Sequence, residues 1–119
     1  GFGYDYMSEC LNPDSRIKVE NCNADILFLA AKDDDCWPSD VAVPRMLKVL
    51  EDSNYPHRVE SKIYDKASHA LVDGIDAFSG MTKFVFKKMI PAEKNYPEEC
   101  EAARQDSLKH ILKFIEEWQ

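Results

Sequence analysis

The sequence predicts an α/β protein with a parallel βαβ unit and a C-terminal helix. Residues 24–31, ADILFLAA, are apolar on both alternating faces, which is typical of a strand covered on both sides of a parallel sheet. A helical pattern follows this segment, and residues 58–64 then alternate as a second strand does. Strand, helix and strand in this order form a βαβ unit, whose connection is right-handed in nearly all proteins.

The helix between the two strands is expected to begin near Ser39 and to run to about Asp52. Pro38, Ser39 and Asp40 form a helix-start signal in which Ser39 is the expected N-cap. The buried face repeats at helical spacing and comprises Val43, Met46, Leu47 and Leu50. Residues 53–56, SNYP, end the helix.

The second strand is followed by a loop, an ambiguous segment and a final helix. Residues 58–64 alternate between apolar and polar side chains, which predicts a half-exposed strand near a sheet edge. Residues 65–72 form the loop after it, and residues 74–91 fit either a helix or a short apolar strand at 84–86. Residues 98–118 predict the clearest helix, because apolar residues recur on one face with charges opposite. That apolar face comprises Leu108, Ile111, Leu112, Ile115 and Trp118.

The composition excludes several classes of partner. The chain has 119 residues, which is one domain at most or part of one. Its formal net charge is −7, with 15 basic against 22 acidic residues, so a phosphate backbone would be repelled and no nucleic acid is expected. No apolar stretch reaches the roughly 20 residues that span a bilayer, so no membrane partner is expected. The first residues, GFGYDYMSEC, show no signal peptide pattern.

The four cysteines are spaced as isolated thiols rather than as metal ligands. Cys10, Cys22, Cys36 and Cys100 form no CxxC pair, and the three histidines are not spaced to complete a zinc site with them. An even count permits two disulfides, but the chain carries enough apolar residues to fold without them. We therefore expect reduced thiols, a cytoplasmic location, and neither a metal nor a cofactor.

Three consecutive aspartates, Asp33 to Asp35, stand where the most hydrophobic strand ends. One alternative is a solvated turn whose acids favour the N-terminus of the next helix. In open α/β sheets, however, reactive groups lie just beyond the carboxyl ends of parallel strands. His69 follows the second strand, and adjacent strands are about 4.8 Å apart, so an aspartate and this histidine can meet. A carboxylate that accepts from the imidazole Nδ1–H stabilises the imidazolium formed in general-base catalysis.

Four segments of the sequence resemble a known family. They are IKVEN at 17–21, KDDDCWPS at 32–39, YDKASHAL at 64–71, and the tail from Tyr96 to Trp118. Together with the strand and helix between them, they look like the C-terminal half of an α/β-hydrolase, most similar to the family of acyl-CoA thioesterases and bile-acid-CoA:amino acid N-acyltransferases. The resemblance covers roughly residues 16–119, and residues 1–15 are expected to form a connecting segment of the same single C-terminal fragment. Ala31 and Ser68 depart from the pattern, because the family usually has glycine there.

The resemblance implies a Ser/Cys–His–Asp triad in which Asp34 is the acid and His69 the general base. The family order is nucleophile, acid, histidine, so the nucleophile would lie upstream on a G-x-S-x-G or G-x-C-x-G turn, and no serine or cysteine of this chain has such flanking glycines. The chain would be the C-terminal half of an acyl hydrolase or acyltransferase, inactive alone. Its substrate would be an acyl thioester or ester. Trp37 would border the acyl pocket or pack against the start of the helix.

Two alternatives belong to other classes. One is a non-catalytic, hydrolase-like interaction module. The other is a receiver-type phosphoacceptor domain, since a strand that runs into Asp33 and Asp34 resembles a pocket for Mg²⁺. A receiver also needs a third aspartate at the end of a central strand, and residues 58–91 supply no apolar strand that ends in one.

The predicted sheet is incomplete, because the strand 24–31 has a single parallel neighbour at 58–64. Its other edge would present unpaired backbone groups, and apolar edges of this kind recruit partners. We therefore expect the chain to associate with the N-terminal part of the same domain, to pair with a second copy, or to exchange elements in a homo-oligomer.

Overall fold

A two-stranded parallel sheet lies at the centre of the fold. The computed structural model describes residues 16–71 and 80–118. The elements in chain order are η2 (Val19–Asn21), β1 (Ile26–Ala31), α2 (Ser39–Asp52), β2 (Val59–Tyr64), α3 (Gly80–Met89), α4 (Pro91–Asn95) and α5 (Pro97–Glu116). The α/β class predicted from the sequence is confirmed, with a parallel βαβ unit and a C-terminal helix.

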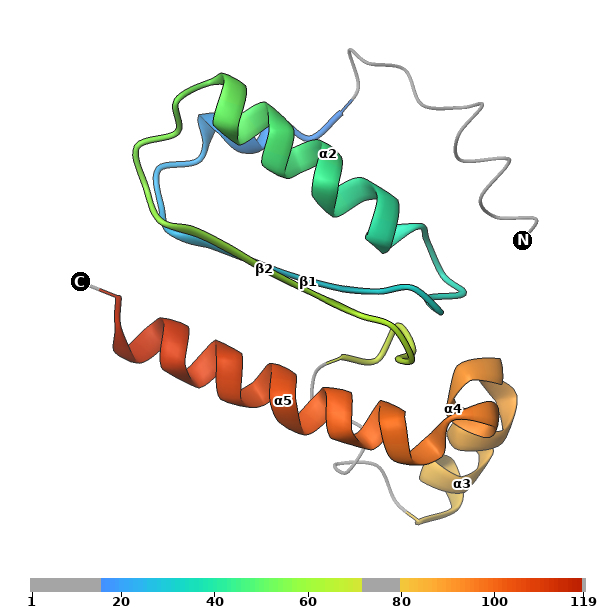
Figure 1. The fold of residues 1–119 in the computed structure, drawn as a ribbon. Coiled ribbons are helices and arrows are strands. Elements are labelled where there is room, and N and C mark those ends of the chain that lie inside the picture. The colour runs from blue at the N-terminus through green and yellow to red at the C-terminus, as the bar shows by residue number, and fades with distance from the viewer. Residues whose placement is uncertain (1–15, 72–79, 119) are drawn as a thin grey trace.

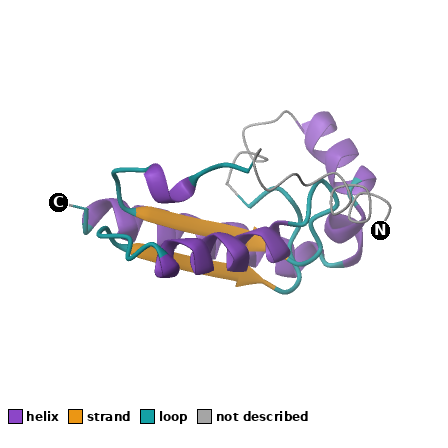
Figure 2. Cartoon of the chain, turned by 90° about the horizontal axis from the view of Figure 1, so that it is seen from above, coloured by secondary structure: helices purple, strands orange, loops and turns teal. Residues whose placement is uncertain are grey.

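The two strands are in register over their whole length. Ile26 of β1 pairs with Val59 of β2, and Ala31 pairs with Tyr64. Two hydrogen bonds continue the ladder past the strand ends, from the Ile26 amide to the Arg58 carbonyl and from the Lys32 amide to the Tyr64 carbonyl, both at 2.9 Å. Because both strands end at the same edge, the loops that follow them emerge side by side (Figure 2).

The sheet is sandwiched between two helices, with α2 on one face and α5 on the other (Figure 1). Successive side chains of a strand point to opposite faces. On the α5 side, Leu29 and Tyr64 pack against a buried cluster of Ala31, Ala67, Leu71 and Ala103. On the α2 side, Ala30 is fully buried. The double coverage expected for this strand is therefore complete at its carboxyl end, while residues 26–29 are only partly buried.

Helix α2 has the predicted bounds but a different first turn. Pro38 is the N-cap residue, and no side-chain hydrogen bond caps the helix. The prediction that Ser39 is the N-cap is therefore wrong. Ser39 is the first helical residue, and its hydroxyl is directed back to Asp34 and to the carbonyl of Ala31 instead. This buried serine ties the start of α2 to the end of β1.

The ambiguous segment forms a helix where it is described. Residues 80–89 are α3, so the alternative of a strand at 84–86 is wrong, and residues 74–79 lie outside the described part of the chain. The short helix α4 was not expected, and it begins with Pro91, a residue favoured at the first helical position.

Helix α5 also differs from expectation in the face that it buries. Its buried residues are Cys100, Ala103, Arg104 and Ser107. Most of the predicted apolar face is exposed instead, with Leu108, Leu112, Ile115 and Trp118 between 36% and 62% accessible. The helix therefore packs on the sheet through small residues near its start and leaves an apolar stripe uncovered.

Candidate active site

Asp34 is the buried member of the acidic triplet, with 4% of its surface exposed. Its Oδ1 accepts hydrogen bonds from the amides of Cys36 at 2.9 Å and Trp37 at 3.3 Å. Its Oδ2 accepts one from the hydroxyl of Ser39 at 3.0 Å. A buried carboxylate requires such donors, and a turn that begins with an aspartate supplies amides two and three residues further on.

His69 lies against this carboxylate. Its Nδ1 is 3.0 Å from Asp34 Oδ2 and 3.1 Å from Oδ1, while its side chain is 52% exposed. An ionised carboxylate can only accept, so the proton of this hydrogen bond lies on Nδ1. The other ring nitrogen, Nε2, is then the one left to take up a proton. The two side chains therefore meet, and an imidazole held by a carboxylate in this way is able to act as a general base.

Strand register is what brings Asp34 and His69 together. Ala31 and Tyr64 are the paired last residues of β1 and β2, and the two loops leave the sheet from that pair. Asp34 follows Ala31 by three residues, and His69 follows Tyr64 by five. A shift of the register would separate the two side chains, although each loop would be unchanged.

Comparison with known protein families identifies the family of the chain. The family model described as BAAT / Acyl-CoA thioester hydrolase C terminal matches residues 4–117. The chain belongs to this family of BAAT and acyl-CoA thioester hydrolase C-terminal domains. The match begins before residue 16, where the resemblance of the quoted motifs begins. No curated protein and no solved structure matches the chain.

Membership in the BAAT/thioester hydrolase family sets the site in an α/β-hydrolase-related domain, from a family associated with hydrolase and acyltransferase activity. It leaves no place for the receiver-type alternative. Among the described residues, no helix combines the length and apolar character needed to cross a membrane.

For Asp33, Asp35 and Trp37, the structure gives no side-chain hydrogen bond to His69 among the described residues. Asp33 is partly buried and Asp35 is exposed, and the hydrogen bonds of His69 go to Asp34. Trp37 joins the Asp34 turn through its amide, and its side chain is 37% exposed at the helix start. A role for Trp37 in an acyl pocket of this BAAT-family domain stays a prediction.

A buried polar cluster under the His69 loop was missed from the sequence. It consists of Ser68, Glu93 and Arg104, which come from the loop after β2, from α4 and from α5. The available signal was a run of small and polar residues at helical spacing in α5, namely Cys100, Ala103, Arg104 and Ser107. The apolar residues of α5, which are more hydrophobic, predict a different buried face.

Cysteines are free wherever the structure describes them. Cys22 and Cys36 are exposed, and Cys100 is buried. Burial raises the pKa of the Cys100 thiol, and the nearby Glu93 carboxylate raises it further. The absence of disulfides among these three agrees with the expected reduced thiols, and Cys10 lies outside the described residues.

One group of side chains could hold a cation. One ligand atom each from Asp34, Cys36 and His69 lies within 4.8 Å of the others. Both oxygens of Asp34 already accept hydrogen bonds, including the one from His69. A cation would therefore compete for Asp34 with the hydrogen bonds that this carboxylate already accepts.

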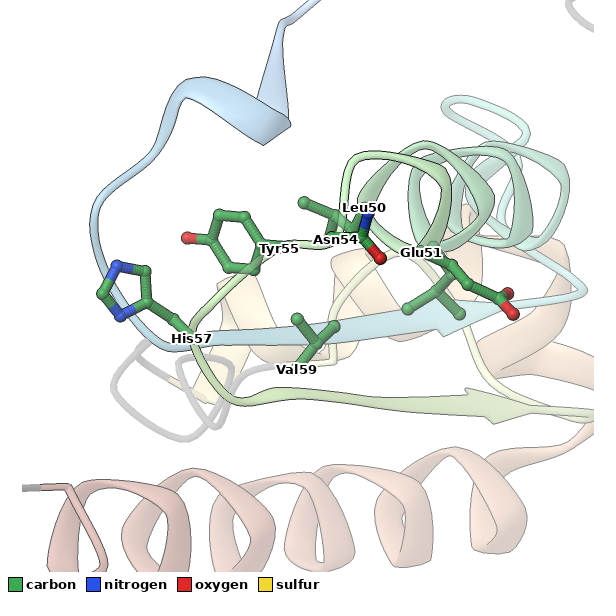
Figure 3. A pocket seen from close by; sticks show the side chains of 7 residues that line it. Leu50, Glu51, Asn54, Tyr55, His57 and Val59 are labelled. Atoms are coloured by element: carbon green, nitrogen blue, oxygen red, sulfur yellow. The ribbon is translucent and has the colours of Figure 1, made fainter.

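Two surface pockets of the described residues lie at the opposite end of the sheet. One of about 420 Å³ is bounded by the end of α2 and the start of β2, and its lining includes Leu50, Tyr55, His57 and Val59 (Figure 3). His57 is held there by Asn23, with Nε2 at 2.7 Å from the amide oxygen, and by an edge contact with the Tyr55 ring. These contacts hold His57 within the fold, at the end of the sheet opposite Asp34 and His69.

Proposed function

We propose that this chain supplies the acid and the base, Asp34 and His69, of a Ser/Cys–His–Asp triad in an acyl-CoA thioesterase or acyltransferase. The observation that carries the proposal is the hydrogen bond of 3.0 Å between His69 Nδ1 and a buried, fully hydrogen-bonded Asp34. Family membership supports the acyl-CoA thioester as the substrate class. The partly exposed His69 ring is open to a nucleophile from outside the described residues.

The reaction follows from these positions. His69 Nε2 takes the proton of a serine hydroxyl or cysteine thiol while the serine oxygen or cysteine sulfur attacks the thioester carbonyl. Asp34 stabilises the imidazolium that results. The tetrahedral intermediate collapses, the C–S bond breaks, and His69 returns the proton to the departing CoA sulfur. Water or an amine, deprotonated by His69, then attacks the acyl-enzyme. The bond between the acyl carbon and the serine or cysteine breaks, His69 returns the proton to that side chain, and the acid or the amide is released.

The nucleophile is proposed to come from the N-terminal part of the same domain. A nucleophile elbow needs glycines on both sides of the serine or cysteine. The glycines of this chain are Gly1, Gly3, Gly74 and Gly80, and none of them flanks a serine or cysteine in that pattern. The 119-residue chain is therefore expected to be inactive by itself, while the longer protein that includes the elbow is active.

Substitution in that longer protein tests the triad. Asp34→Asn should reduce kcat about 10⁴-fold, because the asparagine no longer holds the imidazole in the tautomer that can accept a proton at Nε2. His69→Ala removes the base and should reduce kcat by a similar order. The matched controls are Asp33→Asn and Asp35→Asn, which make the same chemical change beside Asp34 and should retain kcat within about tenfold.

Three results would contradict the proposal. If Asp35→Asn or Asp33→Asn causes the large loss, the acid has been assigned to the wrong residue. Steady thioester hydrolysis by the purified 119-residue chain would show that the nucleophile lies within it. Full activity of both Asp34→Asn and His69→Ala would instead favour the non-catalytic interaction module.

A further inference from the structure

A buried ion pair lies beneath the His69 loop. Glu93 is 1% exposed and Arg104 is 4% exposed, and the Arg104 guanidinium donates a hydrogen bond to Glu93 Oε1. Removing two charges from water is costly, and a buried pair of this kind can often be replaced by apolar residues without loss of stability. Its presence therefore calls for a function other than stability.

The third member of the cluster connects this pair to the loop. The Ser68 hydroxyl donates to Glu93 Oε1 at 2.6 Å. The same hydroxyl oxygen accepts a hydrogen bond from the Ala70 amide at 3.2 Å. One side chain therefore holds the backbone on both sides of His69, and that side chain is in turn oriented by Glu93. The imidazole itself makes no hydrogen bond to the cluster, so any influence on it passes through the loop.

The geometry of Glu93 favours this contact over simple neutralisation of Arg104. A carboxylate placed only to pair with a guanidinium commonly uses both oxygens in a forked arrangement. Here the donors from Ser68 and Arg104 converge on Oε1, and the buried Oε2 has no hydrogen-bond partner among the described residues. The carboxylate is turned toward Ser68 at the expense of its second oxygen.

We propose that Glu93 is a positioning residue for His69 and acts through Ser68. It fixes the loop so that Nδ1 stays within 3.0 to 3.1 Å of the Asp34 oxygens while the ring remains half exposed. This inference rests on the proposed function, since it concerns the base of the same triad. Arg104 holds the Glu93 carboxyl group in place through its hydrogen bond to Oε1.

The test uses Ser68→Ala in the full-length protein that includes the nucleophile, because this variant leaves the buried ion pair intact. Misplacing a catalytic group by a fraction of an ångström to about 1 Å costs up to roughly 100-fold in rate. We expect kcat to fall about 10- to 100-fold, with KM unchanged within about twofold. In the proton NMR spectrum, the His69 Nδ1–H resonance that depends on Asp34 should broaden or exchange faster with water.

A double-mutant cycle with Glu93→Gln tests whether the two residues act as one unit. If Glu93 acts through Ser68, the double variant should lose no more kcat than the worse single variant. The control for general destabilisation is Leu50→Val, a change at a buried position of α2 on the other face of the sheet. It should lower Tm without altering kcat or the Nδ1–H resonance.

Three results would overturn the inference. They are wild-type kcat and resonance in Ser68→Ala, multiplicative losses in the cycle, or an equal loss of kcat in Leu50→Val. If Asp34→Asn leaves both the resonance and the activity unchanged, the proposed function itself fails, and the inference is overturned with it. That pattern differs from the one in which Asp34→Asn is inactive and only Ser68→Ala behaves as wild type.

Discussion

Asp34 differs from Asp33 and Asp35 in burial, although the three side chains are chemically identical. A buried carboxylate is tolerated only where donors surround it. The chain itself supplies two of them, because the turn after Asp34 aims the amides of Cys36 and Trp37 at its Oδ1. The Ser39 hydroxyl and the His69 ring supply the others. The direction of the backbone in this turn therefore determines that Asp34, and neither of its neighbours, is buried with hydrogen-bond donors around it.

Thiol reactivity should show the same effect of local environment. Burial and the nearby Glu93 raise the pKa of Cys100, so less of it is thiolate at a given pH. At pH 8, iodoacetamide should alkylate the exposed Cys22 and Cys36 several-fold faster than Cys100, measured by mass spectrometry of peptides from the native protein. Equal rates in the native protein would contradict the buried position of Cys100, and equal rates in urea serve as the control.

At the scale of elements, α5 joins the sheet through polar bonds along β2. The Tyr64 hydroxyl donates to Asp106 at 2.7 Å, and Arg58 lies over the ring of Phe114 and pairs with Glu117 at 2.6 Å. These contacts attach the helix at two points more than two turns apart. The helix can therefore hold the His69 loop from below, although most of its apolar stripe is exposed.

The Tyr64–Asp106 bond predicts a loss of stability at alkaline pH. Burial, and then the hydrogen bond to Asp106, raise the pKa of Tyr64 above its ordinary value near 10. Its contribution is therefore fully present below about pH 10 and is lost as the pH rises through the folded-state pKa. Tyr64→Phe should lower the free energy of unfolding at pH 7 by about 0.5–1.5 kcal/mol.

Urea unfolding between pH 7 and 11 measures this effect. The difference between wild type and Tyr64→Phe should shrink as the pH rises above 10, because the phenol then ionises in the unfolded state while the folded state, with its raised pKa, still holds the proton. A constant difference over the whole range would mean that the hydroxyl contributes through packing rather than through this hydrogen bond.

For the whole molecule, the main feature is a surface that the described residues leave uncovered. The amides of Ile26 and Lys32 point toward β2, so by alternation those of Leu27 and Leu29 point to the other edge of β1, which no described strand pairs. Two residues of the apolar stripe, Ile115 and Trp118, line a pocket with residues 24 and 25, which lead into β1. Among the described residues, the open edge of β1 and the exposed stripe of α5 together make up the uncovered surface.

We propose that the N-terminal part of the same domain covers this surface. In sedimentation at micromolar concentration, the 119-residue chain should not be a compact monomer, and added N-terminal part should convert it to a one-to-one complex. Leu112→Glu places a charge on the stripe and should weaken that complex about tenfold or more, since burying an unpaired charge is costly. Lys113→Gln changes the net charge equally and is the control.

Other outcomes would identify a different occupant. A stable dimer that ignores the N-terminal part would favour a second copy of the chain as the partner of β1. A cooperatively melting monomer at all concentrations would mean that other parts of the chain already cover the edge.

The sequence by itself determined the fold class, the order of the elements and the neighbourhood of the site. Hydrophobic periodicity is a local signal, and it located β1, α2, β2 and α5 within a few residues. Parallel strands present their carboxyl ends at one edge of a sheet, and this rule alone predicts that an aspartate after β1 and a histidine after β2 lie close together.

Only the tertiary structure decided which faces and side chains are buried. Ser39 is not the N-cap, because its hydroxyl bonds to Asp34 instead, and the two side chains come within hydrogen-bond reach only after the turn between them has formed. The apolar stripe of α5 is mostly exposed, and the small residues on another face are buried. The face that a helix buries depends on how its side chains fit those of the opposite surface, and not on the pattern of the helix alone. Glu93 and Arg104 meet for the same reason. Contacts between residues distant in sequence depend on register and packing, and no local pattern encodes them.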